Sequence, residues 1–397
     1  MGRRIFKQRF GLYGVIQIMG KRSRSIGRKE KADEYYSLDR LLECNATYNI
    51  AFGKRSRGKT FACLKYCLER FVKYGEQFAY VRREDTDFKQ KRAAVLFDNL
   101  NAAGVIYELT HGEWSEVYYY SGRFYLSKVD EEHQTRTNSP DPIGFTFSLT
   151  TSSHDKSAAF PDVWNIFFDE FIPEVGHTYL YQEFAVFHGL LSTIIRKKIG
   201  VKIFMAANAL DPYCIYFREF GLKHVKDMKP GQLDTYTFDN ERLTIAIEYT
   251  DSSPTDSESE YYYAFDNPRL KMITDGTWSM DLYPHLTPEM KYKPKDVKLT
   301  YYIEYDNECV KCEIVKMNRD YFTSIHRKTT PIKDEKALIF STEQQLGRTR
   351  RVLINSPIDQ VGKAIWQQFF EKKVYYSENE VGNLVDAYIQ WCYENRR

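Results

Sequence analysis

The sequence predicts an α/β protein of two domains, the first of which contains a mainly parallel sheet. Between residues 47 and 208, apolar segments of strand length alternate with segments of helical periodicity. This alternation is typical of a parallel sheet covered by helices. A second series of strands and helices begins near residue 297, and 397 residues suffice for two cores. The predicted division is a basic arm and lead-in helix over 1–45, a domain over 46–221, an irregular linker over 222–295 and a smaller α/β domain over 296–397.

The elements of the first domain follow from hydrophobic periodicity. From Thr60 to Tyr74, apolar residues recur at helical spacing, and Gly75 is suited to end this helix. The charged segment 84–100 is also predicted to be helical, whereas 129–142 is predicted to be a polar loop. The remaining predictions are strands over 47–53, 77–83, 105–110, 115–120, 123–128, 143–150, 163–170 and 201–208, and a helix over 181–196.

The pattern is different in the second half of the chain. Regular periodicity is lost over 221–260, and residues 251–260, which are mostly Asp, Glu and Ser, form an acidic, polar loop. The predicted elements of the second domain are strands over 297–305, 310–316 and 337–342, followed by helices over 359–372 and 377–394.

The charge of the chain is unevenly distributed. Residues 1–31 contain ten Lys or Arg and one acid, although the formal net charge of the whole chain is only +3. A basic arm on a mildly acidic body suggests contact with a polyanion, nucleic acid first. No apolar run approaches the ~18–20 residues that cross a bilayer, so no membrane partner is expected.

The pentapeptide GKRSR occurs twice, at 20–24 and at 53–57, but only the second copy has the surroundings of a phosphate-binding loop. It follows a predicted strand, continues into Gly-Lys-Thr and precedes a predicted helix. Inward-facing backbone N–H groups, a lysine for the β- and γ-phosphates and a hydroxyl for Mg²⁺ are the parts of such a loop. The predicted nucleotide-binding residues are therefore Gly53, Lys54, Arg55, Ser56, Arg57, Gly58, Lys59 and Thr60.

The acids that end the strand over 163–170 favour ATP hydrolysis over other phosphate chemistry. Asp169, with Thr60, is predicted to hold Mg²⁺, and Glu170 is placed to orient and deprotonate a water molecule. A kinase would need no water-activating acid. A GTPase interpretation finds only Asn208-Ala-Leu-Asp211, which lacks the lysine of a guanine-recognition motif.

Three segments behind this loop resemble a known family. YGEQFAYVRR (74–83), FPDVWNIFFDEFI (160–172) and RKKIGVKIFMAANALDPY (196–213) are similar to the DNA-packaging ATPases, or DNA encapsidation proteins, of phi29-type tailed phages, which are related to large terminases. The similarity covers about 45–220 and, more faintly, 297–394. It implies an additional-strand P-loop ATPase domain followed by an RNase H-like domain that has lost its nuclease function.

The resemblance also implies a function and partners. It implies a homo-oligomeric ring, pentameric in that family, which binds the portal of a procapsid and hydrolyses ATP to translocate double-stranded DNA. A structural packaging RNA is a further partner in phi29-type motors. The expected location is the host cytoplasm, transiently on the procapsid and not in the mature virion.

Several site residues are implied by the resemblance, and the residues themselves leave alternatives open. Arg196 matches an arginine finger that acts on a neighbour's ATP, and Lys156 matches a second residue acting in trans. Arg196 would equally suit a helix C-terminus, and Lys156 a solvated loop. Asn208 matches the position that couples the γ-phosphate to movement, and a polar side chain ending a buried strand needs a partner.

Contacts with DNA should be electrostatic and independent of sequence, because a packaging motor must pass any base. The candidates are Lys89, Lys91 and Arg92, where the family places a DNA-facing loop. Two other functions remain open: a large terminase that also cuts DNA, with Glu304, Asp306 and Asp386 as nuclease candidates, and a nucleotide-binding assembly scaffold with little turnover.

Overall fold

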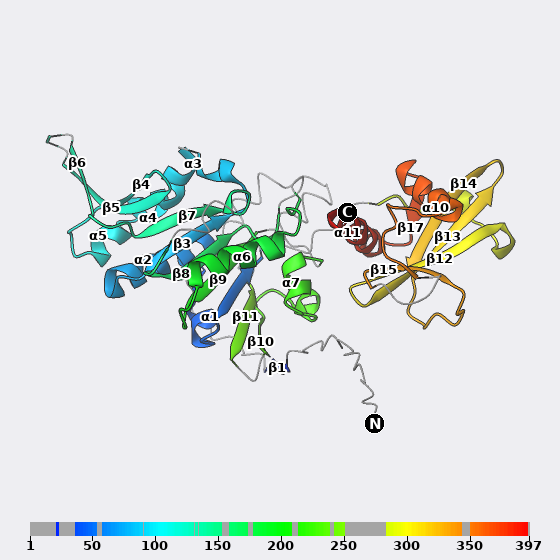
Figure 1. Ribbon diagram of the computed structural model, residues 1–397, viewed down its shortest axis with the longest axis horizontal. Coiled ribbons are helices and arrows are strands. Elements are labelled where there is room, and N and C mark those ends of the chain that lie inside the picture. Colours follow the sequence, from blue (N-terminus) through cyan, green and yellow to red (C-terminus); the bar gives the residue numbers. More distant parts are fainter. Residues whose placement is uncertain are drawn as a thin grey trace, which may run out of the picture.

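The computed structural model consists of two lobes (Figure 1). It describes residues 21–23, 36–53, 58–89, 91–130, 132–133, 135–152, 159–173, 178–208, 213–238, 242–250, 283–343 and 350–395. Most of the predicted basic arm lies outside these residues. The predicted lead-in helix is present as the short α1 (Asp39–Glu43).

The larger lobe contains an eleven-stranded sheet whose centre is parallel. Six neighbouring strands run parallel in the order β11-β2-β9-β8-β3-β7. They are β2 (Tyr48–Phe52), β3 (Gln77–Arg82), β7 (Gly144–Ser148), β8 (Val163–Asp169), β9 (Lys202–Ala207) and β11 (Leu243–Tyr249). Antiparallel strands extend both edges: β1 (Lys21–Ser23) and β10 (Leu233–Phe238) beside β11, and β5 (Arg123–Asp130), β4 (Glu116–Tyr120) and β6 (Thr135–Asn138) beyond β7. The prediction of an α/β fold with a mainly parallel sheet is confirmed.

The order of the central strands positions the site. Strand β9 lies between β2 and β8, and Ala206 is in register with both Ala51 and Asp169. Because parallel strands end at the same edge of a sheet, the residues that follow β2, β8 and β9 are neighbours in space. The predicted phosphate loop, the acid pair and Asn208 therefore share one edge.

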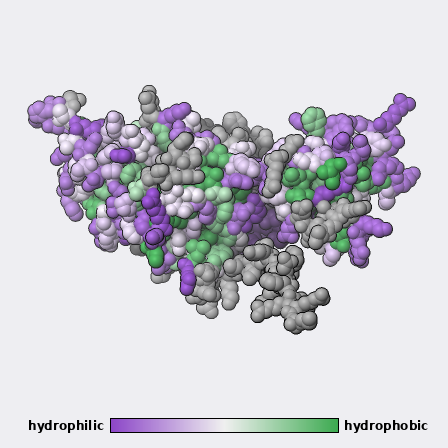
Figure 2. Space-filling model, in the orientation of Figure 1, coloured by the Kyte–Doolittle hydropathy of each residue, from purple (hydrophilic) through white to green (hydrophobic). Residues whose placement is uncertain are grey.

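Helices cover both faces of this sheet because successive residues of each strand point to opposite sides. On one face, Ala51, Tyr80 and Phe167 pack with buried residues of α2 (Lys59–Tyr74). On the other, Ile50 and Phe168 pack with α6 (Glu183–Ile195) and α7 (Ile215–Glu219). Gly75, at φ 72°, ends α2 in the left-handed conformation that glycine adopts without strain. Hydrophobic side chains gather on the visible surface over α6, whereas most of both lobes is hydrophilic (Figure 2).

The segment 84–100 is helical as predicted, in four short pieces: 3₁₀ helices at Asp85–Phe88 and Val95–Phe97, α3 (Lys91–Ala94) and α4 (Asp98–Ala102). Two other local predictions in this lobe are wrong. Residues 105–110, predicted as a strand, form α5 (Val105–Leu109), since burying Ile106 against α2 outweighs the β propensity of this apolar run. Strand β6 lies within the predicted polar loop 129–142.

The predicted linker over 222–295 is wrong in its first part. Strands β10 and β11 belong to the main sheet, with β11 parallel to β2, so this domain extends to about residue 250 rather than 221. Ile245, Ile247 and Tyr249 of β11 are buried in its core. The sequence pattern fails here because a terminal antiparallel pair carries no helix between its strands.

The smaller lobe has a mixed six-stranded sheet in the order β16-β15-β12-β13-β14-β17. Strands β12, β13 and β14 are antiparallel neighbours, whereas β15 is parallel to β12 and β17 is parallel to β14. The elements are β12 (Val297–Tyr305), β13 (Glu308–Met317), β14 (Asp320–Arg327), β15 (Leu338–Ser341), β16 (Arg350–Arg351), α10 (Gln360–Phe370), β17 (Val374–Tyr376) and α11 (Asn379–Glu394). The predicted strands and helices are present, and β14, β16 and β17 were not predicted.

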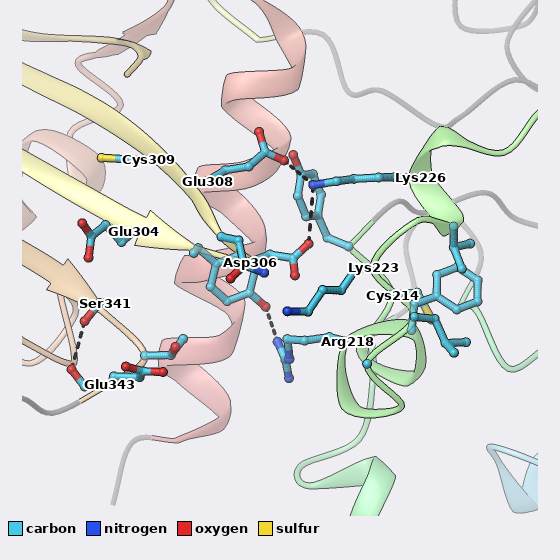
Figure 3. Close-up of a pocket in the computed structure, with 18 residues that line it drawn as sticks. Cys214, Arg218, Lys223, Lys226, Glu304, Asp306, Glu308, Cys309, Ser341 and Glu343 are labelled. Carbon is cyan, nitrogen blue, oxygen red and sulfur yellow. Dashed lines mark hydrogen bonds and ion pairs between the residues drawn. The ribbon is translucent and has the colours of Figure 1, made fainter. Parts of the chain in front are cut away.

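The lobes contact each other through α7 and the residues that follow it. Arg218 donates a hydrogen bond to the Tyr305 hydroxyl, and Lys226 Nζ lies 2.7 Å from Glu308 Oε1 and 3.9 Å from Asp306 Oδ2. These side chains line a cavity of about 520 Å³ between the lobes (Figure 3). Among the described residues that line this cavity, none is a predicted nucleotide-site residue. None of the helices in the ranges given above has the length and apolar character of a transmembrane span.

We predict that Glu394→Gln raises thermal stability in a pH-dependent manner. Burial raises the pKa of Glu394 to about 7. The positive charge of Arg218 opposes this rise, and the negative charges of Glu183 and Glu219 add to it. The folded protein therefore keeps a proton that the unfolded chain loses above its ordinary pKa, and stability falls as pH rises toward 7. The variant lacks this penalty, so its melting temperature should exceed that of the wild type at pH 8 and approach it at pH 5.

The matched control is Glu380→Gln, an exposed acid on the same helix. Its melting temperature should differ from that of the wild type by the same amount at both pH values. A Glu394→Gln difference that does not change between pH 5 and pH 8 would contradict the raised pKa.

Candidate nucleotide site

The residues at the end of β2 have the backbone geometry that a tight loop requires. Gly53 has φ +140°, and a Cβ at this position would lie 2.4 Å from Thr250 Oγ1, so no other residue fits. Its N–H donates to the carbonyl of Ala207, 3.2 Å away, which ties the loop to β9. Gly58, at φ 80°, precedes the first residue of α2. The predicted binding residues Lys54, Arg55, Ser56 and Arg57 lie outside the described part of the chain.

The first two residues of α2 point into the loop and toward β8. Lys59 is buried, with 3% of its surface exposed, and its Nζ donates to the Gly53 carbonyl at 3.0 Å. Thr60 Oγ1 lies 3.2 and 3.3 Å from the two carboxylate oxygens of Asp169. The structure thus brings Lys59, Thr60 and Asp169 together at the N-terminus of a 16-residue helix, where the helix dipole favours an anion.

Asp169 is a buried carboxylate with three side-chain donors. Besides Thr60, it accepts from the Tyr80 hydroxyl at 2.9 Å and from Arg82 Nη1 at 3.4 Å. Burial raises the pKa of Asp169, although Arg82, Tyr80 and Thr60 act in the opposite direction. These donors compensate part of the cost of removing a charge from water.

Glu170, the residue after β8, is less buried than Asp169. Its backbone adopts φ 56°, and its side chain remains about one third exposed. Arg82 Nη2 lies 2.6 Å from its Oε2, so one guanidinium contacts both acids. Burial alone would lower the pKa of Arg82, but Tyr80, Asp169 and Glu170 raise it overall.

The sequence analysis missed Tyr80 and Arg82 as site residues. Both lie on β3, two positions apart and therefore on the same face, in the strand next to β8. The signal in the sequence was the arginine that ends a predicted parallel strand, at the edge where the acids also lie. Recognising it requires knowing that β3 and β8 are neighbours.

A second cavity, of about 210 Å³, lies beside the acid pair. Its lining includes Tyr80, Arg82 and Asp169, together with Arg92 from the predicted DNA-contact segment. Arg92 is exposed and its Nη1 lies 3.6 Å from Asp87 Oδ1. Lys89 is also exposed, and the side chain of Lys91 lies outside the described part of the chain.

Of the three residues carried over from the family, the structure describes Asn208 and Arg196 and does not bring these two together. Asn208 follows β9 at the same edge as the loop and is half-buried. Arg196 lies between α6 and β9, at the opposite edge, and its Nε donates to the Thr193 carbonyl at 3.3 Å. Since the six residues of β9 span roughly 20 Å, Arg196 cannot reach the loop of its own chain. Lys156 lies outside the described residues.

The residues that converge here fit a magnesium–triphosphate group. Mg²⁺ prefers oxygen ligands and is usually held by one or two protein oxygens and substrate phosphates. Thr60 Oγ1 and the Asp169 carboxylate provide such oxygens within 3.3 Å of one another. The buried Lys59 ammonium beside the loop supplies the matching positive charge.

The sequence model of the Podovirus DNA encapsidation protein (Gp16) family matches residues 30–230. This chain belongs to that family. It is 30% identical over 190 residues to the DNA packaging protein of Bacillus phage phi29, covering 46% of this chain and 50% of the relative. It is 29% identical over 185 residues to the DNA packaging protein of Bacillus phage B103, covering 46% of this chain and 49% of the relative. The matches thus span about half the length of these relatives.

Two solved structures are similar over most of this chain. One is the Phi-28 gp11 DNA packaging motor, with a TM-score of 0.52, 17% identity and coverage of 92% of this chain and 100% of the other. The other is the bacteriophage Phi-29 viral genome packaging motor assembly, with a TM-score of 0.51 and 19% identity. This match covers 89% of this chain and 98% of the other. At these identities the likeness shows the fold alone. The family resemblance predicted from the sequence is confirmed.

We predict that Arg82→Met destabilises the encapsidation protein by about 3 kcal/mol, because it leaves a buried carboxylate without its cation. Unfolding in urea at neutral pH measures this change. The control is Lys65→Met, which removes an exposed i,i+4 pair with Glu69 and should cost less than about 1 kcal/mol. Equal losses in both variants would show that Arg82 does not compensate the charge of Asp169.

Proposed function

We propose that this encapsidation protein is an ATP-hydrolysing motor that translocates double-stranded viral DNA into a preformed procapsid. The observation that carries the proposal is the convergence of Lys59, Thr60, Asp169 and Glu170 at the carboxyl edge of the sheet. The loop and the N-terminus of α2 bind the triphosphate, and Lys59 compensates its charge.

The two acids have separate proposed roles, metal binding for Asp169 and activation of water for Glu170. Thr60 and Asp169 would hold Mg²⁺, which when bound neutralises charge on the phosphates. Glu170 orients the attacking water and accepts its proton at a carboxylate oxygen. Arg82 lies 2.6 Å from Glu170 Oε2 and favours the charged carboxylate, so weakening this contact would make Glu170 a stronger base.

A ring of subunits accounts for the position of Arg196. Its side chain is exposed at the edge opposite the loop, where it would face a neighbouring chain in a head-to-tail ring. There it stabilises the transition-state charge of the neighbour's ATP, as an arginine finger does. Lys156 is proposed to act in trans as well, and Asn208 to sense the γ-phosphate from β9. The pentamer of the phi29-type family is the proposed ring.

The proposed partners are DNA, the portal and a structural packaging RNA. Lys89, Lys91 and Arg92 are proposed to contact the phosphate backbone, which gives salt-dependent binding without sequence preference. Such a motor acts in the host cytoplasm, transiently on the procapsid.

We propose that the smaller lobe is an RNase H-like domain that binds a partner rather than cutting DNA. Within the described residues, no group of three or more His, Cys, Asp or Glu side chains is placed to hold a metal. Of the three nuclease candidates, Asp306 pairs with Lys226, and Asp386 accepts from the Tyr283 hydroxyl at 2.9 Å. An active nuclease would instead need several carboxylates around two metal ions.

Glu170→Gln should lower the DNA-stimulated ATPase rate by about 10²- to 10⁴-fold, because the amide cannot accept the proton of water. Affinity for ATP should be unchanged, since the loop and Lys59 remain. The measurement is kcat with and without linear duplex DNA over a salt series, with the exposed Glu113→Gln as control. A Glu170→Gln variant with wild-type turnover would refute the base assignment. A wild type without DNA-stimulated turnover would favour the assembly scaffold.

Mixing Arg196→Ala and Glu170→Gln subunits should restore hydrolysis that neither variant has alone. At half of the mixed interfaces, a subunit with Glu170 receives Arg196 from its neighbour. The ATPase rate of the mixture is compared with the sum of the separate rates. If the mixture shows no recovery, Arg196 only caps α6.

A further inference from the structure

The backbone of Glu170 adopts an unfavourable conformation that its surroundings must maintain. A φ of 56° in a residue other than glycine costs roughly 1–3 kcal/mol and persists only where neighbouring groups determine it. The contacts of this peptide therefore identify what holds the proposed base in place. Two N–H groups of this turn are bonded: the Glu170 N–H donates to Asp169 Oδ1 at 3.2 Å, and the Phe171 N–H donates to the carbonyl of Ala206 on β9 at 3.3 Å.

Arg83 holds the other side of the same peptides. Its Nη1 donates to the Glu170 carbonyl at 3.1 Å, and its Nη2 donates to the Phe171 carbonyl at 2.8 Å. Arg83 follows β3 directly after Arg82. The two arginines therefore hold different parts of Glu170: Arg82 contacts the carboxylate of Glu170, and Arg83 contacts the main chain of Glu170.

Arg83 is itself fixed by a buried carboxylate. Its Nε lies 2.7 Å from Glu183 Oε2 and its Nη2 2.8 Å from Glu183 Oε1, and the Glu183 side chain is fully buried. Glu183 also accepts from the Tyr216 hydroxyl and from the Leu180 N–H, both at 2.8 Å. Both carboxylate oxygens therefore have two donors, and the guanidinium has little freedom to move.

This arrangement does more than stabilise the fold. A buried ion pair contributes little net stability compared with apolar residues of similar volume. A lysine could neutralise Glu183, but it lacks the planar fork that reaches two successive carbonyls and a carboxylate together. In this protein the Arg83 guanidinium contacts the carbonyls of Glu170 and Phe171, where the chain turns after Asp169 and Glu170.

We propose that Arg83 is a positioning residue for the hydrolysis reaction: held by Glu183, it fixes the main chain of Glu170 and thereby the direction of its carboxylate. This inference rests on the proposed role of Glu170. Glu183 and Tyr216 extend the same network to α6 and α7, the helix whose Arg218 contacts the smaller lobe.

The test uses the full-length chain in two variants. Arg83→Lys keeps the charge opposite Glu183 but loses the fork, and the double variant Arg83→Gln with Glu183→Gln removes both buried charges. In each, kcat should fall about 10- to 100-fold while KM for ATP stays unchanged, because the loop is intact and only the base is displaced. Hydrogen exchange at the amides of residues 170 and 171 should become faster.

The matched control removes another ion pair of the same lobe, between the partly exposed Arg40 and the buried Glu248, in the double variant Arg40→Gln with Glu248→Gln. It should lose stability but keep kcat and the exchange rates of residues 170 and 171. Arg83 variants with wild-type kcat and exchange would overturn the proposal, as would a control that loses kcat equally. If the wild type hydrolyses no ATP, the proposed function fails, while exchange at residues 170 and 171 still decides whether Arg83 fixes this turn.

Discussion

The buried carboxylate of Asp169 is the constraint on which the site depends. Removing this charge from water costs several kcal/mol unless donors surround it. The donors come from two other elements, Thr60 at the start of α2 and Tyr80 and Arg82 on β3. Satisfying one carboxylate therefore fixes the phosphate-loop helix and two neighbouring strands relative to each other. The same requirement brings a hydroxyl and an acid together where a magnesium–triphosphate group would bind.

The parallel sheet explains which of the proposed site residues share one edge and which lie at the other. The loop after β2, the acids after β8 and Asn208 after β9 share the carboxyl edge, because these strands are adjacent and parallel. Arg196 precedes β9 and lies at the other edge. A head-to-tail ring is the arrangement that would return this arginine to an ATP site, that of a neighbour. The larger lobe also contacts the smaller one through α7, where Arg218 donates to the Tyr305 hydroxyl.

Much of the site could be predicted from the sequence because its chemistry is local. The spacing of Gly53, Gly58, Lys59 and Thr60 is the one that a phosphate-binding loop would require, and the acids end a clearly apolar strand. Tyr80 and Arg82 could not be assigned, since their role depends on the pairing of β3 with β8, which lie far apart in the chain. Arg83 has the same difficulty, as Glu183 is 100 residues away.

The fold was predictable where strands alternate with helices, and the predictions failed where this alternation is absent. Strands β10 and β11 were missed because an antiparallel pair at the end of the sheet has no helix between its members. Residues 105–110 have the composition of a strand but form α5, because packing of Ile106 decides the conformation. In both places tertiary contacts, rather than local preference, determine the structure.

The most direct test of the account is calorimetric binding of a non-hydrolysable ATP analogue with Mg²⁺ to the wild type and to Lys59→Ala. Loss of a buried, charge-paired ammonium costs about 2–5 kcal/mol, so affinity should fall by about 30-fold or more. Lys65→Ala, an exposed lysine on the same helix, should bind as the wild type does. Equal affinity of Lys59→Ala and the wild type would contradict the nucleotide site, and with it the proposed motor.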